Sequence, residues 1–328
     1  LDQFGRVATD LRVSLTDHCN LRCTYCMPAD GLDWLPKSEV LTDEELIRLI
    51  GVAVERLGIT DIRFTGGEPL LRRGLEQIVA ATAARQPRPR ISMTSNGISL
   101  SRRATALAEA GMDRVNISLD SVRRATFNKI TRRDRLDDVL AGLAGAAEAG
   151  MGPVKVNAVL LRGINDDEAI PLLRYCLVRG YQLRFIEQMP LDPQHGWDRT
   201  QMITAEEILT ELATAFELTP HPSARGSAPA ERWTASDGSL RGTVGVIASV
   251  TRPFCADCDR TRLTADGQMR TCLFAATETD LRALLRAGAS DQELAEAWQQ
   301  GMWRKLAGHE INSAGFAQPI RPMSAIGG

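Results

Sequence analysis

The chain has 328 residues, of which 44% are hydrophobic and 24% are charged, and its formal net charge is −2 at pH 7. This composition is typical of a soluble globular protein, and the length allows one large domain with a smaller second one. The balanced charge gives no general attraction to nucleic acid or to an anionic membrane, no apolar run approaches the roughly 20 residues that span a bilayer, and no secretory leader opens the chain. We therefore expect a cytoplasmic protein with no nucleic-acid or membrane partner.

Strands and helices alternate from the start of the chain. Asp10–Leu15 alternates in polarity and predicts a strand that runs into a cysteine-containing loop. The run Thr42-Asp43-Glu44-Glu45 has the capping-box pattern that begins a helix, and Gly58 ends that helix. A second strand is predicted at Thr60–Thr65.

The same alternation continues as far as residue 187. Further strands are predicted at Arg90–Thr94, Arg114–Leu119, Val154–Leu160 and Gln182–Glu187, and helices are predicted from about Leu71, Ser101 and Asp166 and in the segment before Gly150. Six strands separated by helices predict a parallel α/β sheet with right-handed crossovers. Functional motifs at the strand ends favour a barrel or partial barrel over an open doubly wound sheet.

The C-terminal third has a different pattern. A helix is predicted at Thr204–Phe216, followed by a linker rich in Pro, Ser, Ala and Gly at His221–Pro229. Beyond the linker we expect a strand at Gly242–Ser249, a hairpin at Arg262–Leu273, two helices and a tail. These features divide the chain into a core domain, residues 1–220, and a smaller domain, residues 221–328.

All but one of the 7 cysteines fall into two triplets, which suits metal ligation in a reducing compartment better than a disulfide framework. The first triplet, Cys19, Cys23 and Cys26, has the spacing C-x3-C-x2-C with no fourth cysteine nearby. Structural zinc takes four ligands, whereas an iron–sulfur cubane held by three thiolates keeps one iron without a protein ligand. His18 is adjacent to Cys19 and would strain to reach the same metal. We therefore favour a catalytic iron–sulfur cluster over structural zinc.

The second triplet, Cys255, Cys258 and Cys272, has the spacing C-x2-C-x13-C. The remaining cysteine, Cys176, lies within a predicted helix and is expected to pack in the core. A zinc site completed by a remote histidine is the alternative for this triplet. Two triplets of the same kind favour a second cluster with an open iron.

A glycine turn, Thr65-Gly66-Gly67-Glu68-Pro69, closes the second predicted strand. Paired glycines let a ligand approach the backbone closely, and the Glu68 carboxylate can accept a hydrogen bond from an ammonium group. From these residues alone, a tight strand-to-helix turn without a ligand is the alternative.

The first triplet, with Tyr25 directly before its last cysteine, resembles the signature loop of the radical S-adenosylmethionine (SAM) superfamily, and the glycine turn resembles the SAM-binding turn of that superfamily. The two triplets together, the C-x-R-x-R run that begins at Cys258 and the Gly327-Gly328 end resemble the GTP 3′,8-cyclase family of molybdenum cofactor biosynthesis. This resemblance extends from Arg12 to Gly328. It implies an α/β fold in which an incomplete (βα)6 TIM-like barrel, the radical SAM core, carries a smaller C-terminal domain with a second [4Fe–4S] cluster.

The resemblance also implies roles for particular residues. Those at the SAM are Tyr25, Gly67, Glu68, Ser118 and Met189. Those at the GTP are Arg12, Arg63, Thr94, Lys155, Arg260, Thr261 and Arg262. The residues implied to be catalytic are the first cysteine triplet, Arg260, Arg262 and the tail Gly327-Gly328, which in the family reaches into the active site. Taken singly, the basic residues are surface charges, Ser118 is a cap, Met189 is a core residue and the tail is a frayed end.

The implied chemistry is reductive cleavage of SAM at the first cluster, abstraction of the C3′ hydrogen of GTP by the 5′-deoxyadenosyl radical and attack of C3′ on C8 of guanine. The product would be (8S)-3′,8-cyclo-7,8-dihydroguanosine 5′-triphosphate, and the cofactors would be two [4Fe–4S] clusters and SAM. The implied partners are a flavodoxin- or ferredoxin-type electron donor and a downstream cyclic pyranopterin monophosphate synthase, and a homodimer is a further hypothesis. No P-loop motif is present, which argues against an ordinary GTPase.

Two alternative functions stay open from the sequence. One is a radical SAM peptide-modifying enzyme with an auxiliary cluster, against which the single C-terminal triplet counts. The other is a non-catalytic, zinc-stabilised binding module.

Overall fold

The computed structural model describes residues 1–327, and Gly328, the last residue of the Gly-Gly end, lies outside the described residues. The strands are β1 (Asp10–Ser14), β2 (Asp61–Thr65), β3 (Arg90–Ser95), β4 (Arg114–Ser118), β5 (Lys155–Ala158), β6 (Gln182–Ile186), β7 (Glu217–Pro220), β8 (Glu231–Ser236), β9 (Arg241–Ile247), β10 (Arg260–Leu263), β11 (Gln268–Arg270) and β12 (Thr279–Asp280). The α-helices are α1 (Asp43–Glu55), α2 (Leu75–Ala83), α3 (Leu100–Glu109), α4 (Arg124–Thr131), α5 (Leu136–Glu148), α6 (Ala169–Val178), α7 (Ala205–Ala213), α8 (Leu281–Arg286), α9 (Asp291–Trp303) and α10 (Met323–Ile326). Short 3₁₀ helices are η1 (Pro69–Leu71), η2 (Arg199–Gln201) and η3 (Cys255–Asp257).

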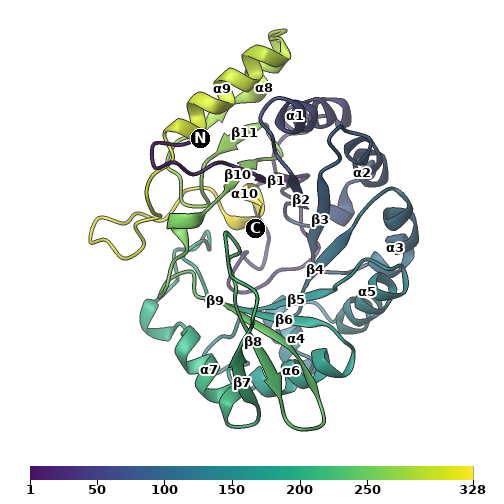
Figure 1. The fold of residues 1–328 in the computed structure, drawn as a ribbon, viewed down its shortest axis with the longest axis vertical. Coiled ribbons are helices and arrows are strands. Elements are labelled where there is room, and N and C mark those ends of the chain that lie inside the picture. Colours follow the sequence, from purple (N-terminus) through teal and green to yellow (C-terminus); the bar gives the residue numbers. More distant parts are fainter. Residues whose placement is uncertain (328) are drawn as a thin grey trace.

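The described strands form one 12-stranded sheet with the order β12-β11-β10-β1-β2-β3-β4-β5-β6-β9-β8-β7. Neighbours from β10 to β9 in this order are parallel, whereas the pairs at both edges are antiparallel. Figure 1 shows the sheet curving around a central space, with helices such as α1, α2, α3, α5, α6 and α7 on its outer side and α10 in the middle. The predicted α/β class and partial barrel are therefore confirmed.

Strands β9 and β10 extend the barrel in a way that the sequence pattern did not predict. β10 pairs in parallel with β1, and β9 pairs in parallel with β6. Segments from the C-terminal third thus add one strand to each side of the six-stranded core. The sheet continues across residue 220, where the sequence suggested a domain boundary, and that boundary stays a prediction.

Local sequence explains where the first helices begin. The Thr42 hydroxyl accepts a hydrogen bond from the Glu45 amide at 3.2 Å, and the Glu45 carboxylate accepts one from the Thr42 amide at 2.8 Å, which completes the predicted capping box of α1. The helix expected from about Leu71 begins later. The segment Pro69–Leu71 forms only the short η1, and α2 starts at Leu75.

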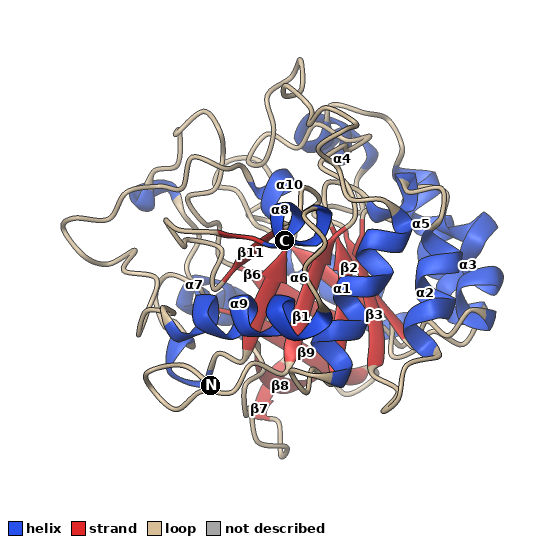
Figure 2. Cartoon of the chain, turned by 90° about the horizontal axis from the view of Figure 1, so that it is seen from above, coloured by secondary structure: helices blue, strands red, loops and turns tan. Residues whose placement is uncertain are grey.

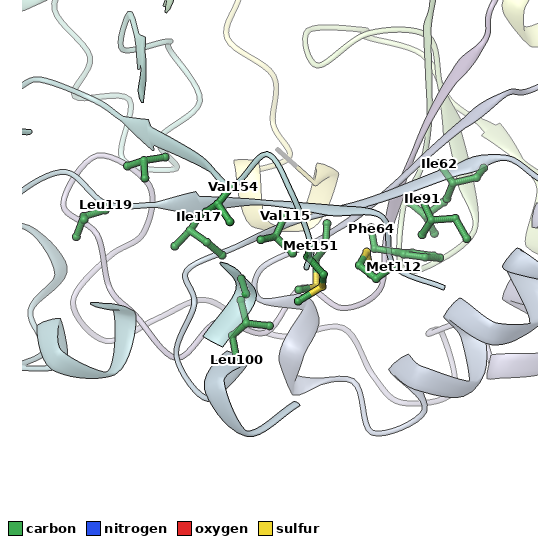
Figure 3. Close-up of a cluster of buried hydrophobic side chains, with 14 of the residues drawn as sticks. Ile62, Phe64, Ile91, Leu100, Met112, Val115, Ile117, Leu119, Met151 and Val154 are labelled. Atoms are coloured by element: carbon green, nitrogen blue, oxygen red, sulfur yellow. The ribbon is translucent and has the colours of Figure 1, made fainter. Parts of the chain in front are cut away.

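The barrel strands bury apolar side chains against the surrounding helices. Figure 3 shows Ile62, Phe64, Ile91 and Ile117 on one side of the strands together with Leu100 of α3, and all of these side chains are 0% exposed. Because side chains alternate along a strand, the residues between these positions face the inside of the barrel. The core thus determines which residues reach the interior.

The arrangement of the loops places the site at one end of the strands. Figure 2 shows many of the longer loops at that end, with α10 and the C-terminal end among them.

Cys176 of α6 is fully buried in the apolar core, as predicted. None of the helices within residues 1–327 combines the length and apolar character that crossing a bilayer requires.

Candidate active site

The inner face of the barrel is polar because the strands alternate between two environments. In β1 and β2 the flanking residues are buried and apolar, whereas Arg12 and Arg63 occupy the alternate positions. The parallel register places Arg12 beside Arg63, and Arg63 beside Ser92 of β3. A period of two along each strand therefore gathers charged side chains inside the barrel.

Basic residues occupy this inner face from β10 to β6, and they are Arg12, Arg63, Arg114, Lys155, Arg184, Arg260 and Arg262. Burial and the neighbouring arginines lower the pKa of Lys155 to about 7, and burial lowers the pKa of Arg63 to about 10. Burial by itself would raise the pKa of Asp10, but the guanidinium groups of Arg12 and Arg63 lower it. The interior therefore has a large excess of positive charge, which favours a polyanionic ligand.

Several buried polar atoms in the barrel have no hydrogen-bond partner within residues 1–327. They are the Nε atoms of Arg12 and Arg260 and the side-chain oxygens of Asn116 and Asn157. Buried polar groups in native proteins are nearly always paired. The unpaired donors and acceptors therefore suit a ligand that combines an anion with hydrogen-bond donors.

Most residues predicted to contact GTP meet on this inner face. Thr94 is half-buried, and its hydroxyl accepts a hydrogen bond from Asn116 Nδ2 at 3.5 Å. The exception is Thr261, which pairs with the core residue Leu11 and whose hydroxyl accepts a hydrogen bond from the Trp298 indole at 3.0 Å. The side chain of Thr261 is therefore turned away from the barrel interior, which departs from the expectation drawn from the sequence.

Arg114 and Arg184 also lie on this inner face, although the motifs in the sequence predicted no role for them. Arg114 lies beside Ser92, and Arg184 lies beside Asn157. Both occupy polar positions of strands whose alternate residues are buried and apolar. The signal that would have found them is the period-two pattern within the predicted strands.

The first cysteine triplet lies in the loop after β1, and the C-terminal end of α4 holds this loop. The Thr24 amide donates a hydrogen bond to the Ile130 carbonyl at 2.9 Å. Arg132, the left-handed residue that ends α4, donates to the carbonyls of Arg22 and Met27, each at 3.0 Å. The backbone on either side of Cys23 and Cys26 is thus fixed by a helix more than one hundred residues away in the sequence.

The glycine turn packs directly against the same loop. The Gly67 amide donates a hydrogen bond to the Thr16 carbonyl at 2.7 Å, and a side chain at Gly67 would overlap the His18 carbonyl. Gly66 has a φ of +139°, which L-amino acids rarely adopt. The paired glycines are therefore required for close packing between the turn and the cysteine loop.

Glu68 is 0% exposed, and its carboxylate accepts hydrogen bonds from protein donors on both oxygens. The donors are the Leu70 amide, the Ser95 hydroxyl and the Asn96 amide, at 2.9, 2.8 and 2.7 Å. Burial raises the pKa of Glu68 to about 7. Asn96 in turn donates to Asn20 at 2.7 Å, so Glu68 is linked to the cysteine loop through a neighbour. Contact of this carboxylate with a ligand ammonium stays a prediction.

Asp120 connects the cysteine loop to the strand ends, and the sequence reasoning did not assign it a role. The Tyr25 hydroxyl donates to Asp120 Oδ2 at 2.8 Å, and the Val159 amide donates to Asp120 Oδ1 at 2.8 Å. Burial raises the pKa of Asp120 to about 6. Ser118, two residues earlier, is half-buried at the end of β4, and Met189 packs in a separate apolar cluster around Met202.

The second cysteine triplet lies at the edge of the cationic interior. Cys255 is the first residue of η3, Cys258 directly follows η3, and Cys272 follows β11. Burial by itself would raise the pKa of Cys258, but the neighbouring cations Lys305 and Arg260 lower it. The positive charge of the barrel therefore extends to this triplet.

Within each triplet the thiols are close enough to act on one another electrostatically. Burial raises the pKa of Cys26 to about 12, with a contribution from Cys19. Burial also raises the pKa of Cys255, with contributions from Cys272 and Cys258. No group of three or more His, Cys, Asp or Glu side chains in residues 1–327 converges as the ligands of a single metal ion do. Each triplet supplies three free thiols, the number that holds a cubane with one open iron, whereas a structural zinc ion takes four ligands.

The C-terminal tail enters the barrel at the ends of β1 and β2. The Arg262 guanidinium donates a hydrogen bond to the Gly327 carbonyl, and Ile326 is 0% exposed. Gly327 has a φ of +87°, and a Cβ atom there would lie 2.8 Å from Thr65 Cγ2. Figure 1 shows this end of the chain in the middle of the barrel, so residues up to Gly327 are packed rather than frayed.

Comparison with known proteins shows to which class of proteins this fold and site belong. Residues 13–176 match the family model of the Radical SAM superfamily, and residues 181–311 match that of Molybdenum Cofactor Synthesis C. A similar fold occurs in Streptococcus suis SuiB bound to the precursor peptide SuiA, with a TM-score of 0.60, 12% identity and coverage of 91% of this chain and 66% of that chain. SuiB bound to S-adenosylmethionine gives a TM-score of 0.57 at 12% identity, with 98% and 77% coverage. The molecule is thus a radical SAM protein.

Curated relatives narrow this class further. The chain is 64% identical over 328 residues to the GTP 3′,8-cyclase of Mycobacterium sp. strain KMS, covering 100% of this chain and 93% of that protein. It is 64% identical over 329 residues to the GTP 3′,8-cyclase of Streptomyces coelicolor, covering 100% and 96%. The chain therefore belongs to the GTP 3′,8-cyclase family.

Proposed function

We propose that this protein converts GTP to (8S)-3′,8-cyclo-7,8-dihydroguanosine 5′-triphosphate, the first step of molybdenum cofactor biosynthesis. The observation that carries this proposal is the buried, cation-lined barrel interior that ends at a triplet of free thiols. Full-length similarity to curated GTP 3′,8-cyclases supports the same activity.

The two cysteine triplets are the residues that would hold two [4Fe–4S] clusters. The first cluster would be held by Cys19, Cys23 and Cys26, and the second by Cys255, Cys258 and Cys272. Three thiols in each group match a cubane with one iron open to a small molecule. When bound, the first cluster and SAM supply the radical chemistry at C3′ of GTP, and the second cluster supplies an iron that anchors the purine.

The residues on the inner face would bind and orient the nucleotide. Guanidinium groups form paired hydrogen bonds with phosphate oxygens, and lysine acts as a point charge. The triphosphate would be bound by Arg12, Arg63 and Lys155, with Arg114 and Arg184 beside them. These cations are buried close to one another and repel one another electrostatically. A bound polyanion would remove their mutual repulsion, and this interaction contributes to affinity.

Arg260 and Arg262 lie between this basic surface and the second triplet. Burial lowers the pKa of Arg262 to about 9, and the Cys272 thiol is among its electrostatic neighbours. The Nε atom of Arg260 has no hydrogen-bond partner within residues 1–327 and lies 4.0 Å from Asp10 Oδ2. We assign these two arginines to the part of the nucleotide next to the second triplet, with Thr94 as a neutral contact on β3.

The SAM is assigned to the side of the barrel formed by the cysteine loop and the adjacent strand ends. Tyr25, the turn at Gly67 and Glu68, Ser118 and Met189 are the proposed contacts. The bond from Tyr25 to Asp120 and the packing of Gly67 on the loop position these groups without a ligand. Such preorganisation lowers the entropic cost of bringing two substrates into reacting geometry.

The tail Gly327-Gly328 would complete the site. The Gly327 carbonyl accepts a hydrogen bond from Arg262, and Gly327 lies against Ser14 and Thr65 at the ends of β1 and β2. A segment in this place excludes water from the reacting centre and limits the motion of Arg262. The catalytic role of both glycines is part of the proposal.

The partners and location are proposals of the same kind. Reductive SAM chemistry requires a one-electron donor, for which a flavodoxin- or ferredoxin-type protein is suitable. The product would pass to a cyclic pyranopterin monophosphate synthase. Free thiols at all cysteines suit a reducing compartment, the cytoplasm, and a homodimer remains a proposal.

Anaerobic reconstitution tests the function. We expect a brown protein with about eight irons per chain, the content of two cubanes. With dithionite, SAM and GTP it should release 5′-deoxyadenosine in proportion to GTP consumed. Iron uptake with deoxyadenosine release indifferent to GTP would contradict the substrate, and a colourless zinc protein would contradict the enzyme.

A further inference from the structure

The segment that follows α9 wraps around the second cysteine triplet. We call Lys305–His309 the strap. Arg6, near the start of the chain, joins the strap to the triplet, because its guanidinium donates to the carbonyls of Cys255 and Leu306, each at 2.6 Å. A Cβ atom added at Gly308 would lie 3.9 Å from Cys255 Cβ, an ordinary contact distance. The strap is therefore part of the wall of the second site.

Lys305 carries the positive charge of the strap and is only 4% exposed. Its Nζ atom lies 3.4 Å from Cys258 Sγ. It also donates to the carbonyl of Cys258 at 3.0 Å and to that of Arg260 at 2.8 Å. No carboxylate forms an ion pair with Lys305 in the part of the chain described here.

A buried ammonium group needs a negatively charged partner, because burial removes the hydration that stabilises its charge. The Cys258 sulfur is the anionic ligand nearest to Nζ when it holds a metal cluster. The two carbonyl bonds place the same ammonium at the start of β10, whose alternate residues Arg260 and Arg262 face the barrel interior. Lys305 thus joins a cluster ligand to the strand that presents the nucleotide-facing arginines.

We propose that Lys305 is a positioning residue for the second cluster and, through β10, for GTP. It compensates the charge of the sulfur ligand at Cys258 and fixes the backbone from which Arg260 projects. This inference rests on the proposed function, since it requires a cluster at the second triplet. A hydrogen bond or positive charge at a cluster sulfur stabilises the reduced cluster and raises its reduction potential.

The test compares Lys305→Met and Lys305→Gln in a full-length variant in which Cys19, Cys23 and Cys26 are alanine, so that only the second cluster contributes to the signal. Lys37→Met, a change at an exposed lysine, is the matched control. The readouts are iron content, the midpoint potential followed by electron paramagnetic resonance, iron loss to a chelator and the dissociation constant of GTP.

We expect Lys305→Met to make the potential more negative, to speed iron loss roughly tenfold, in the range typical of residues beyond the metal ligands, and to weaken GTP binding. Lys305→Gln keeps a donor for the carbonyls but no charge, so its potential should shift while its GTP affinity stays closer to that of the parent. Lys37→Met should match the parent in every readout.

An unchanged potential and GTP affinity in Lys305→Met at equal iron content would overturn the inference and leave the proposed function intact. If Lys305→Met fails to fold by circular dichroism, Lys305→Gln decides by the same readouts. A parent protein that takes up no iron at its second triplet, instead of about four irons per chain, would overturn the proposed function and with it the inference.

Discussion

The two cysteine triplets contain the same number of thiols but lie in opposite electrostatic surroundings. Near the first triplet are buried carboxylates: Glu68 adds to the effect of burial in raising the pKa of Cys19, and Asp120 does so for Cys23. Near the second, Lys305 and Arg260 outweigh burial at Cys258. The groups that act on the thiols therefore differ: buried carboxylates contribute at Cys19 and Cys23, and cations dominate at Cys258.

This difference corresponds to two different tasks. Negative surroundings destabilise the reduced form of a cluster and keep its potential low, as a strong one-electron reductant requires. Positive surroundings suit the capture of an anionic nucleotide. The comparison teaches that two triplets with the same number of thiols can differ in the charged groups around them, and this difference is what the following predictions test.

The largest expected effect is at the first triplet. Cys23→Ser removes a cluster ligand, and 5′-deoxyadenosine formation should fall by more than the roughly 10- to 100-fold typical of changes beyond the ligands. GTP affinity should be retained, because the basic interior and second triplet are unchanged. Chromatography of the product and calorimetric titration of GTP measure the two effects. Cys176→Ala, at the buried cysteine outside both triplets, is the control, and a similar loss there would contradict a specific role of Cys23.

The converse change should separate the two sites. Cys255→Ser is expected to weaken GTP binding by about tenfold or more, because the anchoring iron is lost, and to spare the slow cleavage of SAM without GTP. The dissociation constant of GTP and the yield of deoxyadenosine without GTP are the measurements. Equal GTP affinity in this variant would show that the nucleotide is bound elsewhere.

A smaller effect concerns the charge of the interior. Because the pKa of Lys155 is about 7 in the folded protein, its protonated fraction increases as the pH falls from about 8.5 to about 6.5, and GTP affinity should rise several-fold over this range. The side chain in Lys155→Arg stays charged throughout, so the GTP affinity of this variant should depend less on pH. Titration of GTP itself affects both proteins equally, so the difference between their pH profiles is due to residue 155.

The same shift has a consequence for stability. Between pH 7 and the ordinary lysine value of 10.5, the unfolded chain binds more protons at Lys155 than the folded one, so this residue makes the free energy of unfolding rise with pH.

For GTP binding, identical pH profiles of affinity in the wild type and in Lys155→Arg would refute the assignment of Lys155 to the nucleotide site.

The smallest expected effect sharpens the comparison between the triplets. Asp120→Asn removes a negative charge from the surroundings of Cys23, so the first cluster should become slightly easier to reduce, opposite in sign to the change expected for Lys305→Met. Redox titration measures the shift. The Tyr25 hydroxyl loses a charged acceptor, and the free energy of unfolding should fall by about 1 kcal/mol. A more negative potential would count against the electrostatic explanation.

Local patterns in the chain were sufficient to predict much of the fold and to single out the two cysteine triplets. The alternation of apolar and polar residues at Asp10–Leu15 predicts the first strand, and β1 forms there, whereas Arg12 and Arg63 were assigned to the site only through the family resemblance. The capping box at Thr42 predicts the start of α1. These features depend on neighbouring residues, whose relative positions the backbone geometry sets directly.

Pairings between distant segments were not accessible in this way. Thr261 was expected at the GTP, but the pairing of β10 with β1 sets Thr261 beside the core residue Leu11, and this pairing joins segments about 250 residues apart. Glu68 looked like a ligand contact in the sequence, and only the packed structure shows its carboxylate surrounded by the donors of β3 and η1.

By itself, the amino-acid sequence determined the two groups of thiols, the succession of strands and helices and the charges available to the site, because all of these follow from residue type and short-range spacing. Only the tertiary structure decided that Lys305 reaches Cys258, that the tail reaches Arg262 and that β9 and β10 extend the barrel. The physical reason is that these contacts join segments far apart in the chain, and their proximity results from how the whole core packs.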